Sequence, residues 1–140
     1  MKGNNIYVFD TNALVSATLI KNSVNAKALD LAIETGLIAI SSQLLLEFST
    51  VLMRPKLDSY FKTIEERFEP IKKLERHGKL FKPIISIKAA LDVNDNFILE
   101  LAVEANATAI ITGDKQLLSL DPFDGIPIIN ATLFLQRFEK

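Results

Sequence analysis

The amino-acid sequence predicts an α/β fold, in which helices cover both faces of a central parallel sheet in a three-layer α/β/α, Rossmann-like arrangement. Short apolar runs rich in β-branched residues show no alternation of polar and apolar side chains, which is typical of strands covered on both faces. These runs alternate along the chain with segments of helical periodicity, as expected of strands joined by crossover helices. The 140 residues show no internal repeat, and we expect a single domain over residues 1–140.

The first half of the chain predicts two strands, each followed by helical segments. The expected elements are a strand at 6–9, a helix from near Ala13, a helix at 23–35, a strand at 37–40 and a helix at about 42–53. Gly36 is expected to end the second helix in a left-handed conformation. Ser41 or Ser42 is expected to cap the third, which ends before Pro55 because the residue preceding a proline avoids helical geometry.

The second half predicts a longer polar helix and then a return to alternating strands and helices. The expected elements are an irregular link at 56–61, a helix at 64–76, a weak strand or extended stretch at 80–87, a helix at 94–105, a strand at 109–112, a short helix at 115–120, a strand at 128–129 and a closing helix at 131–138. Pro70 is expected to end, start or kink the polar helix, and Pro83 interrupts the extended stretch.

Four acidic residues stand where an apolar run gives way to a turn or a helix, or at the border of a helix's apolar stripe. They are Asp10, Glu47, Asp95 and Asp114. In a doubly wound sheet, positions that follow the strands converge at the carboxyl edge. Carboxylates gathered there repel one another unless a cation lies among them. The pattern therefore predicts a divalent-metal site that uses these four side chains.

Each acid also has a structural interpretation. Asp10 and Asp114 suit helix caps, with Gly113 allowing a sharp turn before Asp114. Glu47 lies at the border of a buried helical stripe, from which it either reaches water or faces a polar cavity. Asp92 and Asp95 fit a capping box, so Asp92 is interpreted as a cap or an outer contributor to the site. Four such positions together favour one site over independent caps.

The charge distribution is uneven, although the formal net charge is only −1. Between residues 72 and 88 there are six basic residues and one acidic residue, whereas between residues 89 and 140 eight acidic residues accompany three basic ones. A basic band beside an acidic pocket suits a polyanionic substrate cut at a metal centre. A solvated helix face is the alternative.

Other chemistries find little support in the sequence. The chain contains no cysteine, which excludes thiol catalysis and disulfides. No glycine-rich phosphate loop or nucleophile elbow is present. His77, the only histidine, stands near a helix end and is interpreted as a surface or C-cap residue. We see no signal peptide and no membrane-spanning segment, and we expect a cytoplasmic protein without membrane association.

Several blocks of the sequence resemble PIN-domain nucleases, in particular the bacterial toxins of toxin–antitoxin systems (VapC-like). The blocks are Phe9-Asp10-Thr11-Asn12, the helix of Glu47 ending at Pro55-Lys56-Leu57, the run from Asp92 to Ala102, and Ile111-Thr112-Gly113-Asp114-Lys115. The resemblance implies a PIN-like fold in which Asp10, Glu47, Asp95 and Asp114 hold one or two Mg²⁺ or Mn²⁺ ions. It also implies cleavage of single-stranded RNA by a homodimer restrained by a small antitoxin. Leu91, Val93 and Asn94 depart from the usual third motif.

The expected mechanism is metal-assisted phosphodiester hydrolysis. Asp10 and Asp114 would hold an ion that activates water, while Glu47 and Asp95 position that water or a second ion roughly 4 Å away. The supporting residues are expected to be Thr11, Asn12, Asp92, Asn96 and Thr112, with Thr11 and Asn12 orienting the Asp10 carboxylate. The expected RNA contacts are Arg54, Lys56, Lys72, Lys73, Arg76 and Lys115, with Tyr60 and Phe61 as rings on which bases can stack.

Two alternatives belong to other functional classes. A phosphoacceptor receiver domain also has an acidic magnesium pocket on a doubly wound sheet, but it calls for adjacent acids after the first strand, where this chain has Thr11 and Asn12. A non-catalytic PIN-like binding module would keep the fold and act through its partner. Divalent metal would stabilise the nuclease and leave such a binding module unchanged.

Overall fold

The computed structural model describes residues 4–90 and 95–138. The strands are β1 (Asn5–Phe9), β2 (Gly36–Ile40), β3 (Gly78–Leu80), β4 (Ala109–Ile111) and β5 (Ile128–Ile129). The helices are α1 (Thr11–Leu19), α2 (Val24–Thr35), α3 (Ser42–Leu52), the 3-10 helix η1 (Pro55–Tyr60), α4 (Ile64–His77), α5 (Asn96–Ala105), α6 (Lys115–Leu118) and α7 (Ala131–Phe138). Within this part of the chain, no helix is both long and apolar enough to cross a bilayer.

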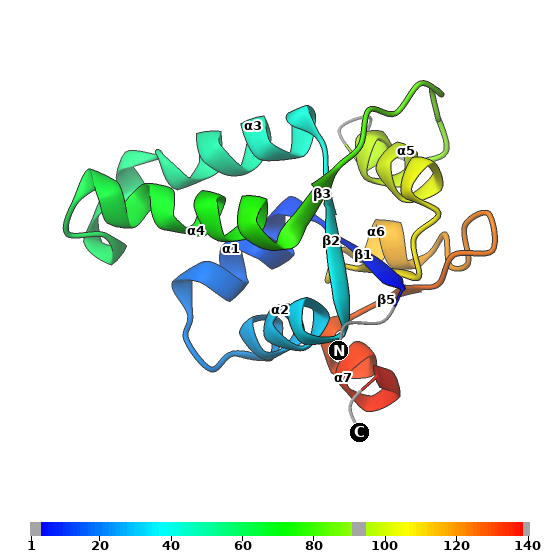
Figure 1. The fold of residues 1–140 in the computed structure, drawn as a ribbon, viewed down its shortest axis with the longest axis horizontal. Coiled ribbons are helices and arrows are strands. Elements are labelled where there is room, and N and C mark those ends of the chain that lie inside the picture. The colour runs from blue at the N-terminus through cyan, green and yellow to red at the C-terminus, as the bar shows by residue number, and fades with distance from the viewer. Residues whose placement is uncertain (1–3, 91–94, 139–140) are drawn as a thin grey trace.

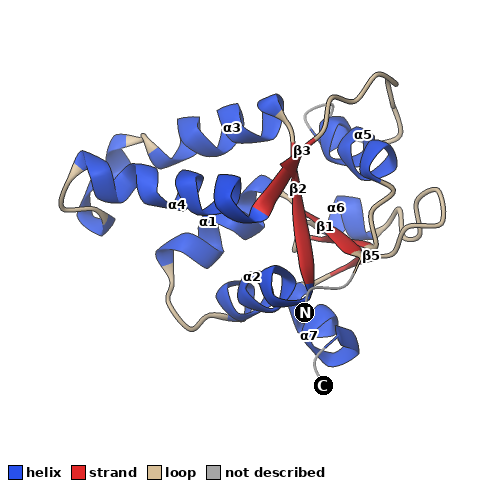
Figure 2. Ribbon diagram, viewed as in Figure 1, coloured by secondary structure: helices blue, strands red, loops and turns tan. Residues whose placement is uncertain are grey.

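The strands form one parallel sheet in the order β3-β2-β1-β4-β5. Helices α1, α2 and α4 lie on one side of this sheet, and α5 and α6 lie on the other (Figures 1 and 2). The three-layer α/β/α fold predicted from the sequence is therefore confirmed. The first strand is central, with β2 on one side and β4 on the other, and this reversal of strand order is where doubly wound folds bind ligands.

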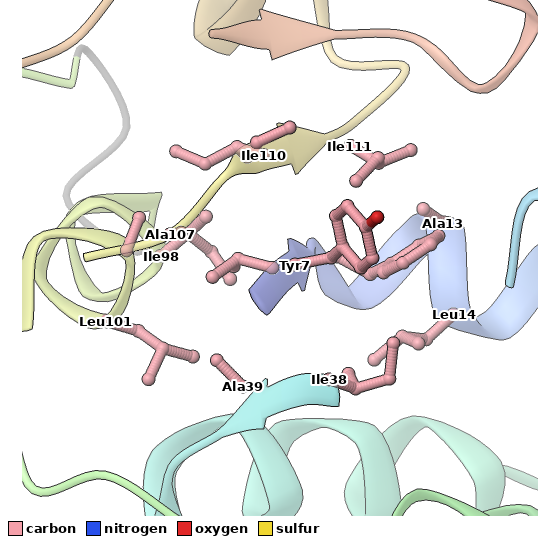
Figure 3. Close-up of a cluster of buried hydrophobic side chains, with 14 of the residues drawn as sticks. Tyr7, Ala13, Leu14, Ile38, Ala39, Ile98, Leu101, Ala107, Ile110 and Ile111 are labelled. Atoms are coloured by element: carbon pink, nitrogen blue, oxygen red, sulfur yellow. The ribbon is translucent and has the colours of Figure 1, made fainter. Parts of the chain in front are cut away.

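The core fills both sides of the sheet with apolar side chains. Figure 3 shows Ile98 and Leu101 of α5 on one side, and Ala13 and Leu14 of α1 on the other. The rings of Tyr7 and Phe9 meet Phe134 of α7 edge to face, with centroids 5.1 and 6.4 Å apart. The strands β1, β2 and β4 are covered on both faces, which explains their uninterrupted apolar runs in the sequence.

Gly36 does not end α2 in the left-handed conformation that the sequence suggested. Its φ of −175° is extended, and the residue opens β2 with no loop between helix and strand. A Cβ atom at this position would lie 2.2 Å from the carbonyl oxygen of Asn5, its partner on β1. Glycine is needed here for close strand approach.

Several other boundaries differ from expectation. The link expected to be irregular contains η1, which begins at Pro55, a residue whose fixed φ suits the first turn of a helix. Helix α4 continues through Pro70 to His77. The edge strand β3, which follows α4, ends at Leu80, and residues 81–90 form neither helix nor strand. Helix α1 begins two residues earlier than expected, and α5 two residues later.

Candidate functional site

Side chains from four separate segments line one small cavity at the carboxyl edge of the sheet. The cavity has a volume of about 30 Å³ and is lined by Asp10, Thr11, Asn12, Glu47, Asp95, Phe97, Ile98 and Asp114. A water molecule needs roughly 10–15 Å³ of such space, so the cavity is large enough for a water or an ion. The structure thus brings together all four acids that the sequence singled out.

Asp10 follows β1 and is both a helix cap and a wall of the cavity. Its side chain is only 6% exposed. The backbone N–H of Ala13 donates to its Oδ1 over 2.8 Å, and the hydroxyl of Thr112 donates to its Oδ2. The capping and functional interpretations of Asp10 are therefore compatible, since one carboxylate serves the first turn of α1 and also faces the cavity.

Burial raises the pKa of the Asp10 carboxyl above its ordinary value of 3.8, because the charged form is removed from water. The neighbouring carboxylates of Asp114 and Glu47 raise the pKa further through like-charge repulsion. The hydrogen bonds from Thr112 and Ala13 oppose this rise without cancelling it. Ionised Asp10 thus lies where a cation would be stabilising.

Asp114 reaches the cavity from the turn after β4. Its Oδ1 accepts a hydrogen bond from the backbone N–H of Gln116 over 2.9 Å and caps α6. Its own N–H donates to the hydroxyl of Thr112 over 3.0 Å, so Thr112 joins Asp10 to Asp114. Gly113 has no positive φ, and a Cβ atom there would meet nothing within 4 Å. The turn therefore makes no use of the conformational freedom that glycine was expected to supply here.

Glu47 and Asp95 complete the acidic lining from the two helices. Glu47 is half-buried on α3, as its place at the border of the apolar stripe predicts. Asp95 holds the N-cap position of α5 but accepts no capping hydrogen bond through its side chain. Asp92, expected to be a cap or an outer contributor, lies outside the described residues.

The predicted supporting residues have different roles from those expected. Thr11 is buried, and its Oγ1 has no hydrogen-bond partner among the described residues, so it does not orient Asp10. Asn12 is exposed and lines the cavity without bonding to that carboxylate. Asn96 lies outside the cavity lining, where its Oδ1 accepts from the backbone N–H of Ala90 over 2.8 Å. Of the predicted supporting residues that the structure describes, Thr112 is the one that orients Asp10, because pairing of Phe9 with Ile111 places the residues after β1 and β4 side by side.

The donor atoms around the cavity fit a divalent ion, although they are not gathered at coordination distance. Across residues 4–90 and 95–138, no three acidic, histidine or cysteine side chains lie close enough together to hold one ion. The available donors are carboxylate and hydroxyl oxygens, the ligands preferred by Mg²⁺ and Mn²⁺. The partnerless Thr11 hydroxyl and the raised pKa of Asp10 both indicate unmet polar interactions in this cavity.

None of the six basic residues expected to contact RNA lines the acidic cavity. Two of them are paired with acids: Lys73 lies 3.5 Å from Asp30, and Arg76 lies 2.7 Å from Glu69. The exposed members of the set are Arg54, Lys56, Lys72 and Arg76, together with Lys115, which follows Asp114 directly. The structure does not collect these side chains into one band beside the acids.

Tyr60 and Phe61, suggested as stacking rings, line a different cavity of about 630 Å³ together with residues of α1, α2 and α4. This larger cavity contains none of the four acids. Phe97 and Ile98 do line the acidic cavity, yet the sequence placed them only on the apolar stripe of a helix. Their position two and three residues after Asp95, in the first turn of the same helix, was the available signal.

The comparisons with known proteins identify a family for this chain. The sequence model of the PIN domain matches residues 7–116. An uncharacterized protein of Methanocaldococcus jannaschii is 30% identical over 142 residues, which cover 95% of this chain and 91% of that protein.

Two solved structures share the fold. VapBC2 from Rickettsia felis, bound to a DNA fragment from its promoter, has a TM-score of 0.60 and 19% identity, over 89% of this chain and 98% of that one. PAE2754 from Pyrobaculum aerophilum has a TM-score of 0.60 and 16% identity, over 96% of this chain and 89% of that one. Because the family match spans most of the sequence and includes all four acidic positions, the chain belongs to the PIN-domain family, whose members are generally nucleases.

Proposed function

We propose that this protein is a divalent-metal-dependent endoribonuclease that hydrolyses phosphodiester bonds of single-stranded RNA. One observation carries the proposal: four acids from separate segments of a PIN domain line one cavity at the carboxyl edge of the sheet. The buried carboxylate of Asp10, with the half-buried carboxylates of three other acids around the same cavity, is unfavourable in its charged form unless a cation or a proton is bound. Their common cavity is best explained as a metal site at which phosphate chemistry takes place.

The residues in and around the cavity have separate roles in the proposed reaction. Asp10, Glu47, Asp95 and Asp114 would hold Mg²⁺ or Mn²⁺, which when bound activates water and stabilises the charge that develops on the phosphate. Thr112 keeps the carboxylate of Asp10 and the backbone of Asp114 in a fixed relation. Phe97 and Ile98 form an apolar wall that limits the entry of other water molecules. A negative cavity repels phosphate by itself, which makes activity without metal unfavourable.

We propose further that the protein is the toxin of a toxin–antitoxin pair, held in check by a small antitoxin, and that it acts as a homodimer. The similarity in fold to VapBC2 over 98% of that chain supports this biological role. The receiver-domain alternative is disfavoured by Thr11 and Asn12, where adjacent acids would be needed. The non-catalytic binding module is an outcome of the test below.

The test is incubation with end-labelled single-stranded RNA in Mg²⁺, in Mn²⁺ and in chelator. We expect internal cleavage in metal and none in chelator. Asp114→Asn retains a capping side chain and should lower the cleavage rate by about 100-fold or more, since loss of a ligand costs at least as much as loss of a supporting residue.

Asp124→Asn is the matched control for this substitution. Asp124 is exposed, has a φ of 51° that asparagine tolerates well, and lies outside the cavity lining. This variant should cut at the wild-type rate. RNA left intact in every metal would favour the binding module, and equal cleavage by Asp114→Asn and wild type would rule out the site.

A further inference from the structure

We propose that the RNA strand lies in a track of three connected cavities along the carboxyl edge of the sheet, with Lys82 binding a phosphate on one side of the acids and Asn25 and Gln116 contacting bases on the other. The proposal rests on the nuclease function above and adds the residues that hold the substrate. None of these three side chains is among the RNA contacts expected from the sequence.

The cavities adjoin one another through shared residues. The acidic cavity shares Phe97 with a cavity of about 240 Å³. It shares Asn12 and Asp114 with a third cavity, of about 520 Å³. The acids therefore lie between two larger hollows.

The three cavities together spread over the carboxyl ends of four neighbouring strands. The first is lined by residues that follow β3 and β2, the acidic one by residues that follow β1 and β4, and the third by residues after β1 and β4 together with α2. Neighbouring strands are roughly 4.8 Å apart, so the three spacings from β3 to β4 cover about 14 Å. A track of this length accommodates an extended segment of a single strand with its cleaved bond over the acids.

Lys82 supplies the positive charge that the acidic cavity lacks. It lines the first cavity with Gln43 and Phe81, is exposed, and takes part in none of the ion pairs found among the described residues. Lys73 and Arg76, by contrast, are paired with acids. Lys82 is thus the unpaired base that borders the cavity next to the acids, and its ammonium group suits a phosphate oxygen.

Glu100 also lines this cavity and is the one negative side chain in it. Its Oε2 accepts a hydrogen bond from the backbone N–H of Ile87 over 2.9 Å, which directs that oxygen to the chain segment rather than to Lys82. Phe81 is half-buried there, so part of its ring is accessible for stacking with a base.

The opposite cavity has a different chemistry. Asn12, Asn25 and Gln116 line it with Ser16, and Asp114 is its only charged member. Their amide groups make no hydrogen bond to other described residues, and each can both donate and accept. Unstacked bases of single-stranded RNA are recognised by such groups through their hydrogen-bonding edges. One side of the track therefore suits a phosphate, and the other suits bases.

The phosphate half is tested by binding in chelator, where metal-dependent cleavage does not occur. Fluorescence anisotropy of a labelled single-stranded RNA of random sequence is measured across a series of NaCl concentrations. Lys82→Ala should weaken binding by about fivefold at roughly 50 mM NaCl and lower the slope of log K against log[NaCl] by about 0.7, the loss of one phosphate contact. Lys62→Ala, an exposed lysine outside all three cavities, should match the wild type. Equal slopes for wild type and Lys82→Ala would overturn this half.

The base-contacting half is tested by sequencing the RNA molecules that the protein retains from a randomised pool. Wild type should enrich particular bases at one or two positions, and Asn25→Ala or Gln116→Ala should remove that enrichment. Gln136→Ala, an exposed glutamine on α7, should leave it unchanged. Absence of enrichment in wild type, or persistence of enrichment in both variants, would contradict base contacts by these amides.

These measurements separate the track from the nuclease. Binding that depends on Lys82, with no cleavage in any metal, would support the track and refute the proposed activity. Metal-dependent cleavage would support the activity. If substitution of Lys82, Asn25 and Gln116 changed neither the affinity for RNA nor the enriched bases, the track would be refuted.

Discussion

Both oxygens of the Asp10 carboxylate accept hydrogen bonds, one from the first turn of α1 and one from Thr112. Its interactions are therefore structural as well as functional. Asparagine preserves the capping oxygen and offers an amide that can donate to the threonine hydroxyl. Replacement by asparagine removes the charge and keeps the local structure.

Asp10→Asn should make the metal-free protein more stable at neutral pH. The pKa of Asp10 is raised in the folded state, so the native protein binds this proton more tightly than the unfolded chain does. The free energy of unfolding consequently falls as the pH rises from the unfolded value of 3.8 through the folded pKa. Asparagine does not ionise, so the free energy of unfolding of Asp10→Asn does not fall for this reason.

Urea denaturation of wild type and Asp10→Asn in chelator, from neutral pH toward pH 3.8, measures the effect. The advantage of the variant should be greatest at neutral pH and shrink as the solution is acidified. An advantage that grows on acidification would show that the charge of Asp10 is stabilising in the folded state.

The sequence predicted the place of Asp10 and Asp114 and named Thr112 as a supporting residue, but it did not reveal that Thr112 joins these two acids. Each acid stands directly after an apolar run, and that pattern is visible locally. The role of Thr112 depends on the pairing of β1 with β4, strands about a hundred residues apart, and no local pattern reveals which strands are neighbours. For the same reason Thr11, next to Asp10 in sequence, was the wrong choice for orienting it.

The close pairing of β1 with β2 leaves no room for a side chain at Gly36. Gly36→Ala places a methyl group 2.2 Å from the carbonyl oxygen of Asn5, so β1 and β2 must separate locally. We expect a loss of about 2–3 kcal/mol in the free energy of unfolding, as for other overpacked positions.

Gly113→Ala is the matched control, because its methyl group would meet nothing within 4 Å. Its effect should stay within about 1 kcal/mol and can be stabilising, since alanine restricts the unfolded chain. Chemical denaturation of both variants measures the difference. Similar losses for the two would show that β2 accommodates the methyl group by a shift of the backbone.

Long apolar elements were predictable because burial on both faces leaves an unmistakable run of residues. Boundaries marked by glycine or proline were harder to predict. A glycine after a helix usually signals a left-handed stop, but α2 passes directly into β2. Glycine is needed at position 36 because the backbone of Asn5 on β1 lies too close for a side chain. Helix η1 was missed because it is supported from outside, where Arg67 of α4 binds Asp58 over 2.7 Å.

At the scale of the whole molecule, the parallel sheet explains why distant acids share one cavity. The carboxyl ends of β1 and β4 are adjacent, and α3 and α5 approach from the flanks. This convergence follows from the alternation of strands and helices. The separation of the carboxylates beyond the reach of a single ion depends on side-chain positions that the sequence does not contain.

Divalent metal should stabilise the whole fold if the acids bind it. A thermal unfolding series in Mn²⁺ or Mg²⁺ should show a rising Tm, with a gain of about 2.7 kcal/mol when the free ion is a hundredfold above its Kd. Asp114→Asn should reduce this gain and Asp124→Asn should retain it. A Tm that is independent of metal would refute binding at the cavity. The homodimer, the single domain over residues 1–140 and the cytoplasmic location stay predictions.

The central position of β1 also determines when during protein synthesis the site can exist. This strand is made first, yet one of its neighbours, β4, is made only at residues 109–111, and Asp114 follows it. A nascent or prematurely terminated chain that stops before this point has Asp10 without its partner across the sheet. An incomplete copy of this kind therefore lacks the assembled acidic cavity.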